Sequence, residues 1–433
     1  MTAPLRVGLA GLGTVGAGVV GLLAANAALI ERRADRRIVV TAVSARDRGR
    51  DRGVDLRHAT WIDDATTLAA RDDVDVVVEM IGGSDGPALV LARAALSAGK
   101  PLITANKAML AHHGLELAEL AEARGVALKY EAAVAGGVPV IKALREGAAA
   151  NRLLTVYGIL NGTCNYILSR MEAEGLSFAA VLADAQARGF AETDPSFDVD
   201  GIDTAHKLAI LSGIAFGARL DFAHVAVEGI RAVAAVDIDH AATLGFRIKL
   251  VGLASEVGGA LFQRVHPCLV PLAHPLAHVA GSLNAVVAEG DFVGRLFFSG
   301  SGAGAGPTAS AVVADLIDVA RGEVGPAFAM PTTRLAALPP ADTAAHVGRC
   351  YLRLTVADRP GVLAELTTAL GDAGVSIESL IQRGAGAGDG GGVYVVMVTH
   401  AVRQSAVTAA LTRMAASSSA LAPPVMMHLL DFD

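Results

Sequence analysis

The chain is poor in cysteine, in aromatic residues and in clustered positive charge, and each shortage excludes a class of protein. Its 433 residues include only three cysteines, with no CxxC pair and no cysteine–histidine spacing typical of a metal site. A disulfide framework and a zinc finger are therefore excluded, and isolated thiols favour a cytoplasmic protein. The net charge is -7 and no cluster of lysine or arginine indicates a basic face, so we expect no nucleic-acid binding.

The chain also lacks a convincing membrane segment. Residues 7–30 carry no charge and follow Arg6, so they could be mistaken for a signal peptide or an anchor. Their glycines are spaced as in a nucleotide-binding turn, however, and we therefore expect no membrane association. Hydrophobic residues make up 53% of the chain and aromatic residues only 4%, which predicts folded domains with cores of aliphatic side chains.

Strands and helices alternate along the first third of the chain. Strands are predicted at 6–10, 37–43, 74–80, 101–104 and 125–131, and helices at 14–28, 87–98 and 115–124. The nearly continuous apolar run of 74–80 is typical of a parallel strand buried on both faces. Repeated strand–helix units predict an α/β fold with a Rossmann-type, doubly wound parallel sheet over 1–130, completed by about 303–325.

The rest of the chain divides into two parts. Residues 131–302 mix helices and strands, which predicts an α+β substrate domain. Catalysis and dimerisation in this domain are implied by the family resemblance described below. Residues 326–345 are interpreted as a linker because they are rich in alanine and proline. Residues 346–433 follow the order β-α-β-β-α-β, which is that of a ferredoxin-like split βαβ domain.

A glycine-rich motif marks the first strand–helix turn. Residues 11–16 read GLGTVG, which is GxGxxG directly after a strand and at the start of a helix. Gly11 permits the tight turn, Gly13 lets the backbone approach a pyrophosphate, and Gly16 lets helix and strand pack closely. The phosphates would lie at the helix N-terminus beside Thr14 and Val15, so the motif predicts a dinucleotide cofactor.

The end of the second strand indicates which dinucleotide binds. NAD sites usually place an acidic residue there for the ribose hydroxyls, but this strand runs into Arg46. An arginine can pair with the 2′-phosphate that only NADP carries. NADP is therefore the expected cofactor, and NAD stays possible because Asp47 follows directly.

A dense group of acids precedes one lysine in the middle of the chain. The acids are Glu192, Asp194, Asp198, Asp200 and Asp203. Asp203 and Lys207 are four residues apart, so they share one face of a predicted helix whose next residues are apolar. The segment lacks the spacing of a calcium loop. It is either a solvated loop with an ordinary helix salt bridge, or a site where carboxylates hold an ammonium group and Lys207 gives a proton to an alkoxide.

Six separated stretches resemble the homoserine dehydrogenase family. They are the GLGTVG turn at 11–16, TANK at 104–107, YEAAVAGGVP at 130–139, NGTCNY at 161–166, the acidic block at 192–207, and GAGAGPTA at 302–309. Members of this family reversibly reduce L-aspartate 4-semialdehyde to L-homoserine on the route to threonine, methionine and isoleucine. No aspartate kinase module precedes the glycine-rich turn, so a monofunctional enzyme is expected.

The resemblance implies roles for individual residues. Lys207 would be the proton donor beside Asp203, and Lys107 at the nicotinamide end would be a second candidate. The remaining implied residues are Glu192, Asp198, Asp203, Gly162 and Thr163 for the substrate, and Gly304 with Lys107 for the cofactor. Glu131 with the backbone carbonyls of Val134, Gly136 and Val138 resembles the family's site for a monovalent cation such as sodium.

The C-terminal unit resembles the ACT domain, a module that binds amino acids. The resemblance rests on its order of elements and on the turn at 358–363, DRPGVL. It implies a homo-oligomer, a dimer or tetramer, and feedback regulation by L-threonine. Two other functions stay open: an aldehyde dehydrogenase with Cys164 as nucleophile, which lacks an evident histidine base, and a redox-inert NADP sensor.

Overall fold

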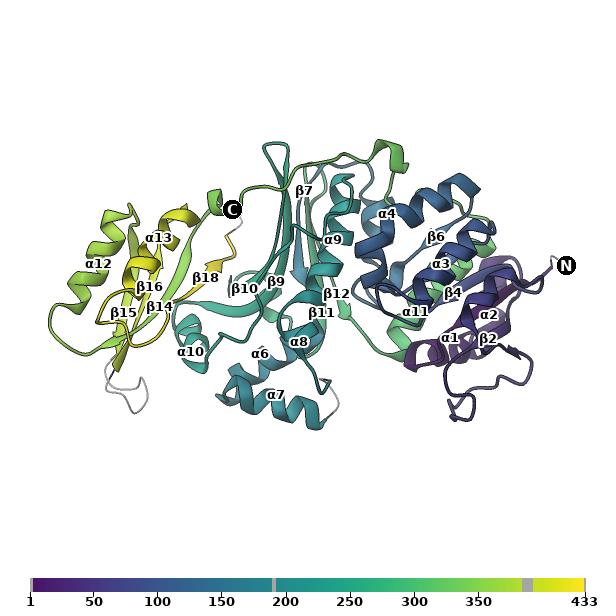
Figure 1. Ribbon diagram of the computed structural model, residues 1–433, viewed down its shortest axis with the longest axis horizontal. Helices are drawn as coiled ribbons and strands as arrows, with labels where there is room; N and C mark the ends of the chain where they lie inside the picture. The colour runs from purple at the N-terminus through teal and green to yellow at the C-terminus, as the bar shows by residue number, and fades with distance from the viewer. Residues whose placement is uncertain (1–2, 189–191, 384–391, 432–433) are drawn as a thin grey trace.

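The computed structural model describes residues 3–188, 192–383 and 392–431, which form an elongated molecule of three parts (Figure 1). A nucleotide-binding part lies at the N-terminal end, a large mixed sheet lies in the middle, and a small α/β unit lies at the other end (Figure 1). The cores are filled mainly by valine, leucine, isoleucine and alanine, as the composition predicts.

The first part is a six-stranded parallel sheet in the order β3-β2-β1-β4-β5-β6. Its strands are β1 (Leu5–Ala10), β2 (Ile38–Ser44), β3 (Thr60–Trp61), β4 (Val76–Glu79), β5 (Leu102–Thr104) and β6 (Leu128–Lys129). This is the strand order of a Rossmann fold, so the predicted doubly wound sheet is confirmed. Ligands of such sheets bind at the carboxyl ends of the strands, where the order reverses between β1 and β4.

Helices cover this sheet, and two of them differ from the sequence prediction. They are α1 (Thr14–Ala25), α2 (Ala27–Ala34), α3 (Pro87–Ser97), α4 (Lys107–Arg124) and α11 (Ala305–Ala320). The predicted single helix at 14–28 is wrong, because α1 ends at Ala25 and α2 begins at Ala27 after an 85° bend. Helix α4 begins eight residues earlier than predicted, because the Asn106 side chain caps it by accepting a hydrogen bond from Met109 N at 3.1 Å.

Helix α11 returns from far along the sequence to pack beside α1. Their approach is close: a Cβ on Gly18 would lie 2.7 Å from the carbonyl oxygen of Ala305. Among the described residues no single helix is both long and apolar enough to cross a membrane; only the sharply bent α1–α2 pair meets the length and composition limits together.

The middle and C-terminal parts share one sheet in the order β12-β11-β7-β9-β10-β18-β14-β16-β15, with β8 added beside β10. In the middle part, the strands are β7 (Leu153–Ile159), β8 (Ala226–Val227), β9 (Phe246–Val257), β10 (Ala260–Pro271), β11 (Leu283–Gly290) and β12 (Gly294–Ser301). The helices there are α5 (Val140–Lys142), α6 (Gly162–Glu174), α7 (Phe178–Ala187), α8 (Ser196–Val199), α9 (Ile202–Phe216) and α10 (Ala235–Thr243).

The C-terminal unit has the predicted ferredoxin-like topology. It comprises β14 (Cys350–Ala357), α12 (Val362–Asp372), β15 (Ile377–Arg383), β16 (Gly392–Thr399), α13 (Gln404–Ala415) and β18 (Val425–Leu429), and a short β13 (Val347–Gly348) pairs with β17 (Val402–Arg403). Between β15 and β16 the sequence is rich in glycine, and residues 384–391 lie outside the described residues. Because β18 pairs in parallel with β10, the unit is an extension of the middle sheet.

Candidate active site

The GLGTVG turn has the geometry of a phosphate-binding loop. Gly11 has φ 96°, and a Cβ there would lie 2.4 Å from the carbonyl oxygen of Met80. A Cβ on Gly16 would lie 2.0 Å from Gly11 O, whereas Gly13 has open space around it. No side chain caps the N-terminus of α1. Two glycines are thus required by packing, and Gly13 leaves free backbone N–H groups facing open space for an anion.

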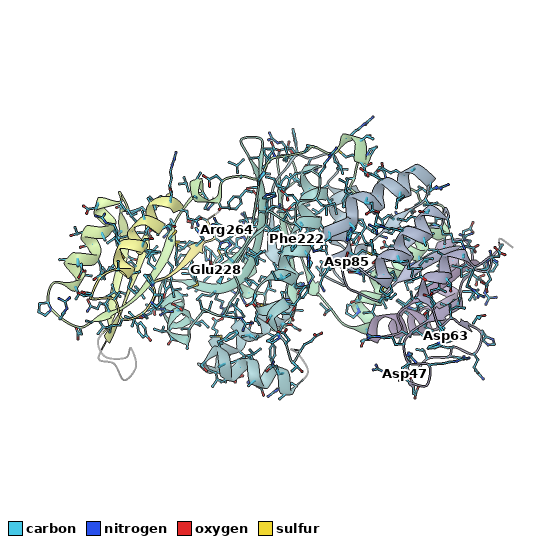
Figure 2. The ribbon with its side chains drawn as sticks, in the orientation of Figure 1. Asp47, Asp63, Asp85, Phe222, Glu228 and Arg264 are labelled. Atoms are coloured by element: carbon cyan, nitrogen blue, oxygen red, sulfur yellow. The ribbon has the colours of Figure 1, made fainter. Side chains whose placement is uncertain are left out.

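The loop after β2 is rich in arginine and adjoins this turn. Five arginines lie between residues 46 and 57, and Arg46 is exposed. Arg52 donates a 3.0 Å hydrogen bond from Nε to Leu12 O in the glycine-rich turn and lies 5.3 Å above the Trp61 ring. With Arg48 and Arg50, Arg52 lines a cavity of about 560 Å³. Figure 2 shows Asp47 in this loop, at the outer end of the molecule.

Lys107 is positioned by hydrogen bonds at the carboxyl ends of β4 and β5. Thr104 Oγ1 donates to Glu79 Oε2 at 2.6 Å and accepts from Asn106 N at 2.9 Å. The Asn106 amide donates to Gly83 O at 2.7 Å. This network fixes the residue before α4, so that Lys107 begins the helix at the edge of the sheet where ligands of this fold bind.

One buried carboxylate joins two lysines from different elements. On α9, Lys207 Nζ lies 2.7 Å from Asp203 Oδ2. From the start of α4, Lys107 Nζ lies 3.0 Å from Asp203 Oδ1. The Asp203 side chain is 5% exposed, that of Lys207 11% and that of Lys107 33%. The predicted helix pair is therefore present, and the fold brings the second predicted lysine to the other oxygen of the same carboxylate.

The charges in this cluster change the pKa of each member. Burial raises the pKa of Asp203, but the charges of Lys207 and Lys107 outweigh it and hold that pKa below its ordinary value. Burial lowers the pKa of Lys207 below that of a free lysine, against the opposing charge of Asp203. For Lys107, burial lowers the pKa, but the negative charges of Asp203, Asp198 and Glu192 outweigh it and raise the pKa overall.

Lys207 has one further partner, at the end of β7. Its Nζ donates to Leu160 O at 2.7 Å, in addition to Asp203. An ammonium group has three protons, so one remains for a substrate oxygen.

The other predicted substrate residues surround this cluster. Asp198 lies on α8 and Glu192 is exposed on the segment before it. Gly162 and Thr163 form the first turn of α6. A Cβ on Gly162 would lie 2.7 Å from Ser282 O, so only glycine fits there.

The second glycine-rich turn, at 302–307, lies against the turn at 136–137. Gly304 has φ 115° and precedes the first residue of α11, the helix that packs on α1. A Cβ on Gly136 would lie 2.4 Å from Gly302 O, and one on Gly137 would lie 2.6 Å from Pro307 Cβ. The fold therefore brings the predicted cofactor residue Gly304 to the side of the molecule that carries the α1 turn.

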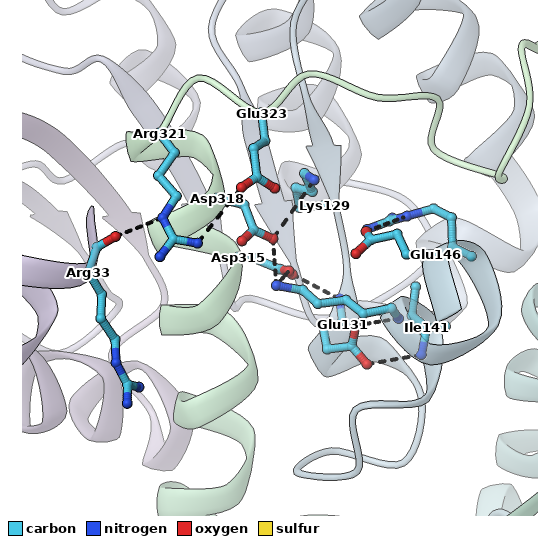
Figure 3. A network of polar contacts seen from close by, with 11 residues as sticks. Arg33, Lys129, Glu131, Ile141, Glu146, Asp315, Asp318, Arg321 and Glu323 are labelled. Atoms are coloured by element: carbon cyan, nitrogen blue, oxygen red, sulfur yellow. Dashed lines mark hydrogen bonds and ion pairs between the residues drawn. The ribbon is translucent and has the colours of Figure 1, made fainter. Parts of the chain in front are cut away.

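Glu131 lies in a buried polar network between β6, α5 and α11 (Figure 3). Its two carboxylate oxygens accept hydrogen bonds from Ile141 N at 2.9 Å and Lys142 N at 2.8 Å. Burial and the nearby Asp315 raise the pKa of Glu131 to about 7. Lys142 belongs to the same network and lies 3.4 Å from Asp315, so burial is the main cause of the raised pKa at the cation site that the family resemblance implies.

That site does not have the composition of a transition-metal centre. Within residues 3–188, 192–383 and 392–431, no group of three or more histidine, cysteine, aspartate and glutamate side chains is arranged to hold a metal ion.

Cys164 is poorly suited to nucleophilic attack. It is fully buried, and burial raises the pKa of its thiol well above the ordinary value. Its Sγ donates to the carbonyl oxygen of Asp198 at 3.2 Å. A reactive cysteine needs thiolate character, so the structure disfavours the aldehyde dehydrogenase with a cysteine nucleophile.

Sequence and structure comparisons agree along nearly the whole chain. The homoserine dehydrogenase profile matches residues 139–317, the homoserine dehydrogenase NAD-binding domain profile matches 11–131, and the ACT domain profile matches 351–416. The homoserine dehydrogenase of Neisseria gonorrhoeae is 42% identical over 98% of both chains. That of Pseudomonas aeruginosa is 43% identical over 98% of this chain and 99% of its own. The crystal structure of a homoserine dehydrogenase from Thiobacillus denitrificans superposes with a TM-score of 0.93, at 41% identity and 99% coverage of both chains.

Proposed function

Because the chain belongs to the homoserine dehydrogenase family, we propose that it interconverts L-aspartate 4-semialdehyde and L-homoserine at the cluster of Lys107, Asp203 and Lys207. The observation that carries this assignment is the buried carboxylate between two lysines from α4 and α9. A bound nicotinamide supplies the hydride for the aldehyde carbon. The chain itself must hold the amino-acid end of the substrate and transfer one proton at its oxygen.

Lys207 carries the proton in this proposal. During reduction, the aldehyde oxygen takes a proton from Lys207 Nζ while its carbon gains hydride; during oxidation, neutral Lys207 removes the hydroxyl proton. The lowered pKa of Lys207 makes it a stronger acid than a free lysine and a base available nearer neutral pH. The raised pKa of Lys107 keeps that side chain charged, so it stabilises negative charge developing on the oxygen.

The amino-acid end of the substrate has complementary charges around it. Asp198 and Glu192 would receive the substrate ammonium group. Gly162 and Thr163, at the N-terminus of the 13-residue helix α6, would receive its carboxylate, because the N-terminal end of a helix favours an anion.

NADP is the proposed cofactor, with NAD as the weaker alternative. The arginine-rich loop beside the glycine-rich turn supports this preference, because guanidinium groups bind a 2′-phosphate. Arg46 would contact that phosphate. Arg52 would act indirectly, since it ties the loop to Leu12 O.

A monovalent cation at Glu131 is the proposed structural ion. It would lie between this carboxylate and the carbonyls of Val134, Gly136 and Val138. The support is the raised pKa of a buried glutamate, which an added positive charge would lower.

Regulation by an amino acid is proposed for the C-terminal ACT domain, with L-threonine as the effector. The turn before α12 supports this, because Gly361 has φ 94° and leaves the N-terminus of α12 without a side-chain cap. Strand β15 is the outer strand of the sheet, so a second copy could pair there in a dimer or tetramer. We place the enzyme in the cytoplasm, since all three cysteines are free and buried.

The direct test is turnover by the purified protein. L-homoserine should reduce NADP faster than NAD, followed by the absorbance of the reduced nicotinamide. The same assay with Lys207→Ala is the control for an active contaminant. If homoserine causes reduction of neither NADP nor NAD, the assignment is overturned, and the NADP sensor becomes the better explanation.

A further inference from the structure

Asn161 lies at the junction of β7 and α6, at the centre of the carboxylate cluster, and none of the roles above involves its side chain. Its amide nitrogen donates two hydrogen bonds of 2.8 Å, one to Asp198 Oδ1 and one to Asp203 Oδ2. Its amide oxygen accepts from Cys164 N at 2.7 Å and caps α6. Asn161 is 4% exposed, and its contacts with Asp203 and Cys164 are buried.

The orientation of this amide is fixed by its oxygen. A flipped amide would direct hydrogens at the N–H of Cys164 and its oxygen at two carboxylates, which no hydrogen bonding allows. Both donor hydrogens must therefore face Asp198 and Asp203. These carboxylates come from α8 and α9, 37 and 42 residues further along the chain.

The two carboxylates have different numbers of free oxygens. Asp203 uses Oδ1 for Lys107 and Oδ2 for Lys207 and Asn161. Asp198 uses Oδ1 for Asn161, and within the described residues its Oδ2 has no side-chain partner. Asp198 therefore has an oxygen available for an ammonium group, whereas Asp203 is occupied by the lysines.

Two carboxylates sharing one amide nitrogen are close enough to repel each other. Each N–H that faces one of them favours its ionised form. If the amide were removed, the repulsion would be relieved by protonation of one carboxylate or by its movement away from the other.

We propose that Asn161 is a positioning residue that holds the carboxylates of Asp198 and Asp203 side by side and so separates substrate binding at Asp198 from lysine binding at Asp203. This inference rests on the proposed roles of Lys207 and Asp203. It adds that a neutral amide from α6 sets the spacing of the two acids.

The variants separate this role from helix capping. Asn161→Ser keeps an oxygen that can cap α6 but cannot donate to both carboxylates. Asn161→Asp also keeps a capping oxygen and replaces both donors by a third negative charge. Ser177→Ala is the matched control, because Ser177 caps the neighbouring helix α7 by accepting from Ala180 N at 3.3 Å and lies outside the cluster.

Asn161→Ser should raise the KM for homoserine by about tenfold, the scale of one hydrogen bond to a charged group, with a smaller change in kcat. The acid limb of its kcat/KM profile, which is set by Lys207, should move to higher pH, because Asp203 Oδ2 is no longer shared with Asn161 and pairs more strongly with Lys207. Asn161→Asp should raise KM further. The KM for NADP should not change in either variant, and Ser177→Ala should affect neither KM nor the pH profile.

The outcomes distinguish the possible errors. Asn161→Ser with the KM and pH profile of the wild type would overturn the positioning role. If KM rises equally for NADP and for homoserine, Asn161 acts only as the cap of α6. If the unaltered enzyme does not oxidise homoserine, the proposed function fails instead, and direct calorimetric titration of homoserine then shows whether any ammonium site exists.

Discussion

Asp237 and Arg353 are 116 residues apart in the sequence and form a 2.6 Å ion pair between the middle part and the C-terminal unit. Their side chains are 0% and 11% exposed. Tyr351 donates to the same carboxylate at 2.9 Å. Nearby, at the position labelled in Figure 2, Arg264 of β10 donates to His428 of β18 at 2.7 Å. The C-terminal unit is therefore held by buried polar contacts as well as by a shared sheet.

Arg353→Met should destabilise the protein by about 3–5 kcal/mol, because it leaves the buried Asp237 without its counter-charge. Urea denaturation measures the loss. The control is Arg413→Met, which breaks an ion pair with Asp372 whose side chains are 56% and 52% exposed, and should cost less than about 1 kcal/mol. Similar losses in both variants would show that the Asp237 pair does not hold the two parts together.

Lys207→Ala should lower kcat by about 10²–10⁴-fold, which is the usual contribution of a general acid. For the unaltered enzyme, homoserine oxidation should speed up as pH rises through the lowered pKa of Lys207, since only the neutral amine accepts a proton. Steady-state rates across pH test this, with the KM for NADP as the control for folding. If Lys207→Ala stays active and Lys107→Ala does not, the proton comes from Lys107.

Arg46→Ala should weaken NADP far more than NAD, because only NADP offers a 2′-phosphate. Arg52→Gln should change the preference for NADP over NAD less, because Arg52 holds the loop by its hydrogen bond to Leu12 O. The kcat/KM values for the two cofactors give the ratio. Arg93→Ala is the control, since Arg93 pairs with Glu116 at 2.7 Å and does not line the cavity that Arg52 lines. If Arg46→Ala leaves the ratio of kcat/KM for NADP to that for NAD unchanged, Arg46 does not contact the 2′-phosphate and points into solvent.

Sodium or potassium should stabilise the protein more at pH 8 than at pH 6. The pKa of Glu131 is raised to about 7, so the folded state binds an extra proton between the ordinary value near 4.5 and about 7. Without a cation, stability contributed by the protonated form is present at low pH and is lost as pH rises through about 7. Melting temperatures with and without salt measure this, and choline chloride controls for ionic strength. In Glu131→Gln, the melting temperature should be the same in sodium or potassium chloride as in choline chloride.

Threonine should bind the protein and inhibit it, and Gly361→Asp should remove both effects while catalysis persists. An aspartate there would place a negative charge at the N-terminus of α12, where a ligand carboxylate is expected. Calorimetry and activity assays are run in parallel, because an effector acts only through different affinities for two states. No heat and no inhibition at millimolar threonine would leave a purely structural domain. Truncation after Pro340 is a poor test, since it removes β18 from beside β10.

The sequence was most informative where structure depends on local patterns. The strands β1, β2 and β4 are short runs of aliphatic residues between turn signals, and the structure places them within two residues of the predicted bounds. The two-residue strand β3 and the early start of α4 were missed. The first residues of α4 carry no clear apolar period, and the signal that was available is the capping Asn106 directly before Lys107.

The site was only partly accessible to the same reasoning. Asp203 and Lys207 share a helix face at a spacing of four residues, so their 2.7 Å contact follows from helix geometry. The expectation that the chain has no arginine cluster was wrong, because the arginines at 48, 50 and 52 follow Arg46 at alternate positions and line one cavity with Arg57. Asn161 was not identified because a capping asparagine before a helix is an ordinary feature, and its contacts with Asp198 and Asp203 are visible only in three dimensions.

By itself the sequence determined the α/β class, the phosphate-binding turn and the pairing of Asp203 with Lys207, because these follow from backbone periodicity and contacts within a few residues. Only the tertiary structure decided that Lys107 reaches the other oxygen of Asp203, and that β18 pairs with β10 and joins the C-terminal unit to the middle sheet. Such contacts join residues far apart in the chain. They depend on how whole helices and strands pack, which no local pattern specifies.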